Sequence, residues 1–324
     1  GCGYPEAEQG YNIGRLVTFL AGMPDSVPGM TFNRLCGSSM QAVLSAAASI
    51  ESGWGDCYLC AGVESMSRVK RRGFNWSPHP GLELDWPEAY VTMGETAENI
   101  AMKWKIGREE QETFALESHI KASTAQREHR FEEEIIPVTD GESVITEDGC
   151  IRPDATLDAM ARLNPVFTEG GSVTAATSSP LTDGAVAMIV CSEEFASQRG
   201  LKVMARIVSG AVSGCPPGIM GIGPVEATRK VLERTGWEIE MVDLFELNEA
   251  FSSQSMAVIS ELGLDRTKIN IDGGALAIGH PLGASGARIV GKAANLLQRT
   301  KSNRAIATMC IGGGMGIAIA LESP

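Results

Sequence analysis

The sequence predicts an α/β protein, and two features of its pattern support that class. In the last third, strand-like apolar segments (202–209, 243–247, 304–310, 317–322) alternate with helical patterns (224–235, 251–262, 283–298). Such alternation is typical of sheets with largely parallel pairing. In addition, small-residue helical segments at 38–50 and 283–298 lead to apolar strands at 56–61 and 304–310. This loose repeat predicts two copies of one unit whose helices pack closely face to face.

The first two thirds fit the same class less regularly. Residues 31–36 are expected to be extended, and 184–191 form a further apolar strand. An amphipathic pattern predicts one long helix over 94–130, whereas the prolines within 67–92 favour a loop. Residues 131–181 are mixed and polar, so no regular element is predicted there.

Composition excludes several classes of protein. The 324 residues, 44% of them hydrophobic, suit a compact protein of two or more domains. A net charge of −13 argues against nucleic-acid or anionic-membrane surfaces. The longest apolar run, 310–321, contains four glycines and is too short to span a bilayer. Eight cysteines without the spacing of a small secreted domain favour a reducing, cytoplasmic compartment.

Cys36 is the first candidate for chemistry. It lies in NRLCGSS, directly before the predicted helix. Unpaired N–H groups at a helix start lower a thiol pKa and favour the nucleophilic thiolate. Gly37 would let the backbone turn, and Ser38 is the expected N-cap. The alternative is a buried cysteine with a purely structural role.

His280 is the second candidate. Of the four histidines, it alone occupies a glycine-flanked turn between apolar segments, in GGALAIGHPLGASGA. An imidazole there could face a cleft and take part in function. A turn histidine with its hydrogen bonds satisfied locally is the alternative.

Two further positions follow strands. Cys310 precedes the turn Gly312–Gly314, whose free N–H groups could form an oxyanion hole; a tight turn beside a buried thiol is the alternative. Asn248 and Glu249 lie where a strand gives way to a helix. They are interpreted either as an N-cap pair or, for Asn248, as the holder of a catalytic water.

No metal site is expected. Cys57 and Cys60 form a lone CxxC inside a strand, with no second pair to complete a zinc site. We interpret both as core thiols.

Taken together, these residues resemble the thiolase family. The segments NRLCGSSMQA, LNEAFSSQ, GGALAIGHPLGASGARI and CIGGGMGIAIALE resemble its nucleophile, Asn-Glu-Ala-Phe, histidine and C-terminal cysteine blocks. Four further segments follow the family order: MGETAEN, IRPDATLDAM, SVTAATSSPLTDGA and MGIGPVEA. The resemblance extends over essentially the whole chain.

The resemblance implies a particular fold. Duplicated βαβαβαββ halves would form five layers, α-β-α-β-α, with an inserted loop domain. The N-terminal domain would comprise 1–65 and 182–201, the loop domain covering the substrate 66–181, and the C-terminal domain 202–324. The chain begins inside the family's first domain, so we expect its opening strand–helix–strand to be absent.

The resemblance also implies roles for individual residues. Cys36 would be the acylated nucleophile, Cys310 the general acid and base, and His280 the activator of Cys36. His280 and a water held by Asn248 would form one oxyanion hole, and the backbone N–H groups of Cys36 and Gly312 a second. The family positions near the pantetheine or nucleotide of coenzyme A match Ser179, Arg152, Met220 and Met93.

The implied activity is cleavage of 3-ketoacyl-CoA by CoA, as in fatty-acid β-oxidation. CoA would be a substrate, and no further cofactor is expected. The alternatives are acetoacetyl-CoA synthesis in the reverse direction and a catalytically silent CoA- or lipid-binding protein. Thr92 stands where acetoacetyl-type thiolases often carry a histidine, which weakens the first alternative. A ketosynthase would pair its cysteine with His/His or His/Asn, so the second cysteine favours thiolase. A homodimer or homotetramer is implied, in the cytoplasm or, if a signal preceded this segment, in an organelle.

Overall fold

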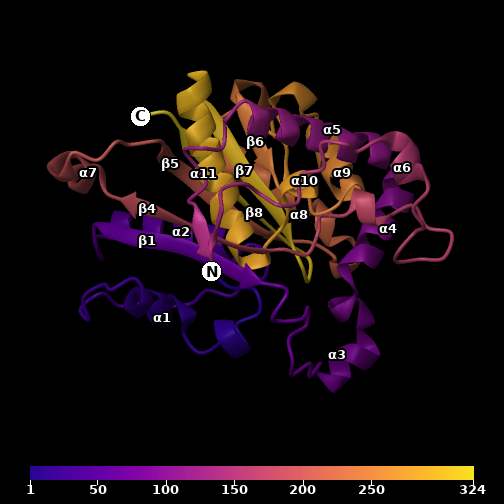
Figure 1. Ribbon diagram of the computed structural model, residues 1–324, viewed down its shortest axis with the longest axis horizontal. Helices are drawn as coiled ribbons and strands as arrows, with labels where there is room; N and C mark the ends of the chain where they lie inside the picture. Colours follow the sequence, from indigo (N-terminus) through magenta and orange to yellow (C-terminus); the bar gives the residue numbers. More distant parts are fainter. The chain divides into compact units, whose positions relative to one another are not determined.

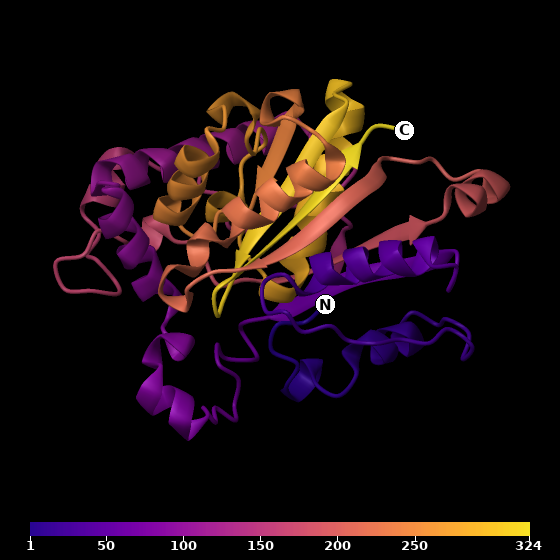
Figure 2. The ribbon, with the colours of Figure 1, turned by 180° about the vertical axis from the view of Figure 1, so that it is seen from behind.

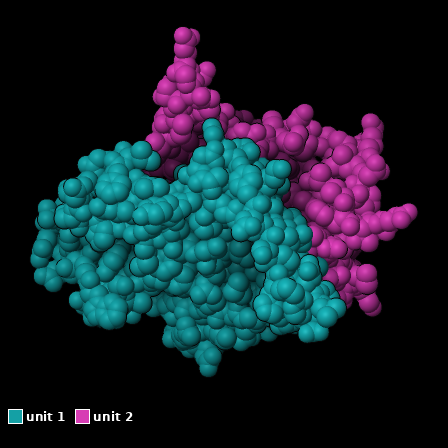
Figure 3. All heavy atoms as spheres, turned by 90° about the horizontal axis from the view of Figure 1, so that it is seen from below, with its two compact units in different colours: residues 1–91, 181–246, 281–324 teal, residues 92–180, 247–280 magenta.

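The computed structural model describes all 324 residues and divides them into two compact units. Unit 1 comprises residues 1–91, 181–246 and 281–324, and unit 2 comprises residues 92–180 and 247–280 (Figure 3). None of the helices combines the length and apolar character needed to span a bilayer.

Two sheets form the framework of unit 1. β1 (Cys57–Ser65) pairs with β4 (Asp183–Cys191), and the second sheet has the order β5-β8-β7-β6 (Figure 1). The bounds of that second sheet are β5 Arg206–Gly214, β6 Leu244–Leu247, β7 Arg304–Ile311 and β8 Met315–Glu322.

The largely parallel pairing predicted for the last third is wrong for β5–β8 and β7–β8, which are antiparallel. β1 and β4 are antiparallel as well. For β7 and β8 the reason is local, because a turn of three glycines joins the two strands directly. Such a hairpin leaves no room for the helical crossover that a parallel pair needs.

Helices lie on both faces of the second sheet. α2 (Ser38–Glu51) and α11 (Leu282–Thr300) pack on each other, and both contact β1, β4 and β8. α8 (Gly223–Thr235) contacts β5, β7 and β8 from the face opposite α11, as Figure 2 shows from behind. Within unit 1 the layers therefore follow in the order sheet, helix pair, sheet, helix. The remaining helices of this unit are α1 Ile13–Leu20, α3 Pro80–Asp85 and α7 Glu193–Arg199.

The predicted close approach of the two small-residue helices is confirmed. The Ser39 hydroxyl in α2 donates to the Ala284 carbonyl (3.1 Å) and accepts the Ala287 N–H (2.8 Å), both in α11. A Cβ added at Gly286 would lie 2.6 Å from the backbone nitrogen of Met40. A side chain larger than hydrogen is therefore excluded at Gly286.

Replacing Gly286 with alanine is expected to lower the free energy of unfolding by about 1–3 kcal/mol, the usual cost of overpacking. Alanine has a higher helix propensity than glycine, so propensity alone would predict a gain in stability where we expect a loss. Urea unfolding measures the difference. Gly149→Ala is the matched control, since a Cβ there meets nothing within 4 Å. Equal midpoints for the two variants would contradict the packing described.

Unit 2 is mainly helical. α5 contacts α6, α9 and α10, and α4 packs on α9. The bounds are α4 Met93–Trp104, α5 Arg108–Arg127, α6 Leu157–Ala161, α9 Ser252–Leu262 and α10 Ala275–Ile278, with a hairpin of β2 Val138–Asp140 and β3 Ser143–Ile145.

The single helix predicted over 94–130 is wrong. Lys105 ends α4 in the left-handed conformation (φ 55°), and α5 starts at Arg108. The Glu110 carboxylate accepts the Gly107 N–H (2.7 Å) and so stabilises the new start.

Four other expectations need correction. The extended segment expected over 31–36 is interrupted at Leu35, where the backbone turns to φ 45°. β5 starts at Arg206 and extends to Gly214, later than predicted. The segment 67–92 contains α3, where Pro80 begins a helix instead of breaking one. Cys60 is buried as expected, but Cys57, at the end of β1, is exposed.

Candidate functional site

The start of α2 places Cys36 beside the end of β7. Gly37 is the N-cap and Ser38 the first helical residue, so the prediction that Ser38 caps the helix is wrong. The Ser38 hydroxyl instead donates back to the Leu35 carbonyl, which fixes the turn before Cys36. A Cβ at Gly37 would lie 2.5 Å from Ile311 Cδ1, so glycine permits this approach.

The turn between β7 and β8 supplies a backbone donor to Cys36. Gly313 and Gly314 have φ of 80° and 86°, a region that favours glycine. The Gly314 carbonyl accepts the Cys215 N–H (2.8 Å), which holds the turn in place. The Gly312 N–H donates to the Cys36 sulfur and lowers its pKa.

The net effect on Cys36 is nevertheless opposite to the prediction from the helix start. Burial raises the pKa of the Cys36 thiol to about 11, against the backbone N–H groups of Gly312 and Cys36 itself. Desolvation of the thiolate outweighs the hydrogen bonds. The resting thiol is therefore protonated at neutral pH, and a base must remove its proton before it can attack.

Cys310 lies buried in β7 and is a still weaker acid. Burial raises its pKa well above the usual value near 9, and the neighbouring Cys36 and Cys215 raise it further. A neutral thiol held beside Cys36 can donate a proton to a developing carbanion.

Cys215 is a third thiol at this position, which the sequence analysis did not single out. Burial raises its pKa to about 11, and its sulfur lies 3.7 Å from the Met220 carbonyl oxygen. Met220 itself is buried in the 3-10 segment Pro217–Ile222. No motif in the sequence indicates a role for Cys215 at this site, because only the fold brings Cys215 close to Cys310.

In unit 2, Asn248 and His280 are in direct contact. Asn248 Nδ2 lies 3.4 Å from His280 Nε2, and both side chains are buried. Asn248 Oδ1 has no hydrogen-bond partner. The N-cap interpretation is wrong for Asn248 and Glu249, because α9 begins at Ser252 and its N-cap is Phe251.

The other predicted residues of unit 2 differ in placement. The Ser179 N–H donates to the Ala250 carbonyl (3.0 Å), which ties Ser179 to the segment that carries Asn248. Met93 is the first residue of α4 and is partly buried. Arg152 is exposed, and its N–H donates to His119 Nδ1 (3.2 Å).

The fold and the matching family models define an acyltransferase of the thiolase family. The family model described as "Thiolase, N-terminal domain" matches residues 3–194, and "Thiolase, C-terminal domain" matches residues 201–323. The chain belongs to this family.

Individual relatives are similar over nearly the whole chain. A 3-ketoacyl-CoA thiolase of Bacillus subtilis is 42% identical over 335 residues, which cover 99% of this chain and 86% of the relative. The crystal structure of human mitochondrial 3-ketoacyl-CoA thiolase in complex with CoA has a TM-score of 0.91 and 37% identity, covering 100% of this chain and 85% of that one. The Bacillus anthracis acetyl-CoA acetyltransferase has a TM-score of 0.90 and 39% identity, covering 100% and 86%. The predicted α/β thiolase fold is confirmed.

Proposed function

We propose that this thiolase cleaves 3-ketoacyl-CoA with CoA, giving acetyl-CoA and an acyl-CoA shortened by two carbons. The proposal depends on one observation: the Gly312 N–H donates to the Cys36 sulfur, and the neutral thiol of Cys310 lies beside that sulfur. The name of the Bacillus subtilis relative supports the same reaction.

The first half-reaction begins when His280 accepts the proton of the Cys36 thiol. The Cys36 sulfur attacks the 3-keto carbon, and the bond between carbons 2 and 3 breaks. The electron pair leaves as the enolate of acetyl-CoA, which takes a proton from Cys310. The acyl group remains on Cys36 as a thioester.

In the second half-reaction the Cys310 thiolate accepts the proton of the incoming CoA thiol. The CoA sulfur attacks the Cys36 thioester, and the Cys36 sulfur leaves and regains its proton from His280. The backbone N–H groups of Gly312 and Cys36 stabilise the oxyanion formed at the carbon bonded to Cys36. His280 and a water held by Asn248 stabilise the enolate oxygen.

Substrate binding is assigned to four side chains. Ser179, Arg152, Met220 and Met93 contact the pantetheine or nucleotide of CoA, and residues 66–181 act as the loop domain over the substrate. CoA is a substrate in this scheme, and its chemistry calls for no further cofactor.

A second candidate function is synthesis of acetoacetyl-CoA by the reverse condensation. The similarity to the Bacillus anthracis acetyl-CoA acetyltransferase favours it. Thr92, the N-cap of α4, argues against it, because acetoacetyl-type thiolases often carry a histidine at this position.

Thiolysis of acetoacetyl-CoA and of a medium- or long-chain 3-ketoacyl-CoA by the purified chain tests the proposal. Faster turnover of the longer substrate supports the degradative function, and faster turnover of acetoacetyl-CoA supports the second candidate. Folded protein without turnover of either would leave a silent CoA-binding role. Light scattering of the same sample tests the proposed homodimer or homotetramer. A reducing, cytoplasmic compartment is proposed on the cysteine spacing alone.

Iodoacetamide is expected to alkylate Cys36 faster than Cys57 at pH 7, although Cys57 is the exposed thiol. The reason is that His280 accepts the Cys36 proton in the proposed scheme, so the sulfur reacts as a thiolate although burial raises its pKa, whereas the scheme gives Cys57 no base. Peptide mass spectrometry after short exposures measures both rates. Cys60, buried in the same strand, serves as the unreactive reference. Slower labelling at Cys36 than at Cys57 would show that no base acts on it.

A further inference from the structure

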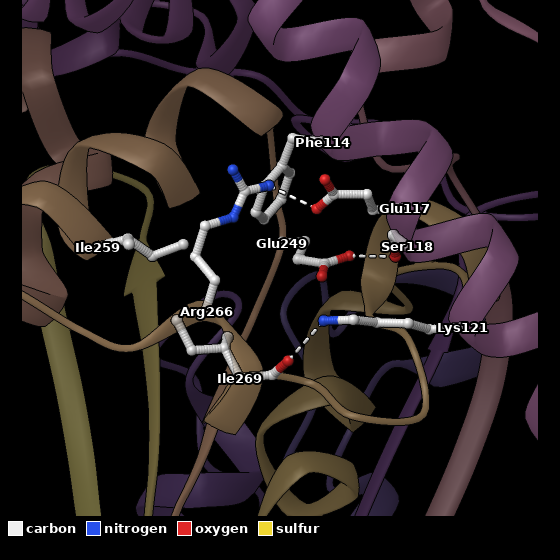
Figure 4. A pocket seen from close by; sticks show the side chains of 8 residues that line it. All are labelled: Phe114, Glu117, Ser118, Lys121, Glu249, Ile259, Arg266 and Ile269. Carbon is white, nitrogen blue, oxygen red and sulfur yellow. Dashed lines mark hydrogen bonds and ion pairs between the residues drawn. The ribbon is translucent and has the colours of Figure 1, made fainter.

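Glu249 follows Asn248 in the chain and lies fully inside unit 2. Its carboxylate accepts hydrogen bonds from the Ser118 hydroxyl (2.6 Å), the Asn270 side-chain amide (2.7 Å) and the Leu276 N–H (3.2 Å). Figure 4 shows the side chains of Glu249 and Ser118 pointing toward each other. Burial raises the pKa of the carboxyl group, and these three donors oppose the rise.

The partners of Glu249 belong to the segment that leads to His280. Asn270 accepts the Leu247 N–H (2.9 Å) and donates to the Leu247 carbonyl (2.8 Å). Ser118 accepts the Gly274 N–H (3.0 Å), and Leu276 lies in α10, which ends just before Gly279 and His280. One carboxylate thus joins the end of β6 to the segment 270–278.

Close backbone contact makes this link rigid. A Cβ at Gly274 would lie 2.2 Å from the Glu249 carboxyl carbon, and one at Gly273 would lie 2.7 Å from Ala122. Gly273 also has a φ of 83°, which favours glycine. The segment therefore passes between Glu249 and α5 with no side chain of its own in between.

We propose that Glu249 is a positioning residue that sets the 3.4 Å contact between the Asn248 amide and the His280 imidazole. Asn248 is held through its neighbour, and His280 through α10. The role of this pair in stabilising the enolate oxygen rests on the proposed function. A displacement of about 1 Å in such a pair costs on the order of 100-fold in rate.

A small cavity lies beside the Glu249 carboxylate, so removal of the carboxylate would leave a larger space there. Its lining is formed by Phe114, Glu117, Ser118, Lys121, Glu249, Ile259, Arg266 and Ile269 (Figure 4). Water can enter a polar space of this kind and bond to groups left without partners. After truncation of Glu249, water would accept the hydrogen bonds of Ser118 and Asn270 without holding these two side chains in their original positions.

The test combines Glu249 variants with removal of Asn248 in the full chain. Glu249→Ala is expected to lower kcat for thiolysis about 10- to 100-fold with KM within about twofold of the original. Glu249→Gln keeps the shape and an acceptor, so it should recover most of that loss. In an Asn248→Ala background, Glu249→Ala should lower kcat less than about threefold, because its effect acts through the contact between Asn248 and His280, which that background has already removed. Glu117→Ala, at the same cavity but in an exposed ion pair with Arg266, is the control that should leave kcat unchanged.

An equal fold-loss in both backgrounds would overturn the proposal, as would normal kcat in folded Glu249→Ala. If the alanine variant does not fold, Ser118→Ala, which removes one hydrogen-bond donor to the carboxylate, carries the same comparisons with a smaller expected loss. His280 also provides a readout without turnover, by ¹⁵N NMR of labelled histidines assigned with His280→Asn. Glu249→Ala should shift the His280 signals more than Glu249→Gln does, and both variants should leave those of exposed His79 and His129 in place. Unchanged His280 signals refute the positioning role, whereas an inactive wild-type chain with shifted His280 signals refutes only the thiolase reaction.

Discussion

Thiolysis is expected to fall by about 10⁴-fold or more when Cys36 is replaced with alanine. The proposed reaction passes through a thioester on the Cys36 sulfur, to which the Gly312 N–H donates. Cys310 is the acid and base of the same scheme, so it cannot also carry the acyl group. The decrease should appear in kcat, with binding of CoA largely retained. Steady-state rates, together with intact mass after mixing with substrate, measure turnover and acylation separately.

Cys57→Ala is the matched control, because Cys57 is an exposed thiol of the same unit, at the first residue of β1. Its rate and its acyl adduct should equal those of the unchanged protein. Substantial turnover by Cys36→Ala, or an acyl adduct on another cysteine, would refute the assignment of the nucleophile.

His280→Ala is expected to lower kcat/KM by about 10²- to 10⁴-fold at pH 7. Burial raises the pKa of Cys36 to about 11, so without a base only on the order of one thiol in 10⁴ is ionised at pH 7. Each pH unit below 11 lowers the thiolate population tenfold. The variant should therefore gain activity steadily as the pH rises from 7 toward 11, while the unchanged enzyme shows no such gradient.

Rates from pH 6.5 to 10 provide this comparison, with His79→Ala as the control for loss of an exposed imidazole. A flat profile in His280→Ala would mean that another group accepts the Cys36 proton. A rising profile in both proteins would mean that His280 plays no part in ionising Cys36.

The elements that the sequence predicts well are those defined by local patterns. The small-residue helices α2 and α11 and the strands that follow them are evident from periodicity, and even their mutual packing follows from Ser39 and Gly286. The glycine turn sets the direction of β8 relative to β7, but the order and direction of β5 do not follow from local sequence, because nothing local shows that β8 lies between β5 and β7. The break at Lys105 is equally hidden, since the amphipathic pattern continues on both sides of it.

The candidate site also combines residues that the sequence indicates with properties that only the fold determines. Glycine-flanked Cys36, His280 and Cys310 are visible in the sequence, but the pKa of Cys36 depends on how completely the fold removes water from its sulfur. Glu249 resembles a helix cap in sequence because it precedes a helical pattern. Its partner Ser118 is 131 residues away, so only the folded chain shows what the carboxylate holds.

The central helix pair also governs how this chain reaches its native state. The Ser39–Ala284 hydrogen bond joins residues 245 positions apart, and the Glu64 carboxylate accepts the Gly283 N–H across 219 positions. At a synthesis rate of roughly 5–20 residues per second, α2 waits about 10–50 s on the ribosome for the helix it packs against. Contacts of such long range also slow refolding in vitro. The nascent chain therefore exposes an apolar, small-residue surface for that interval. We expect chaperones to bind a surface of this kind.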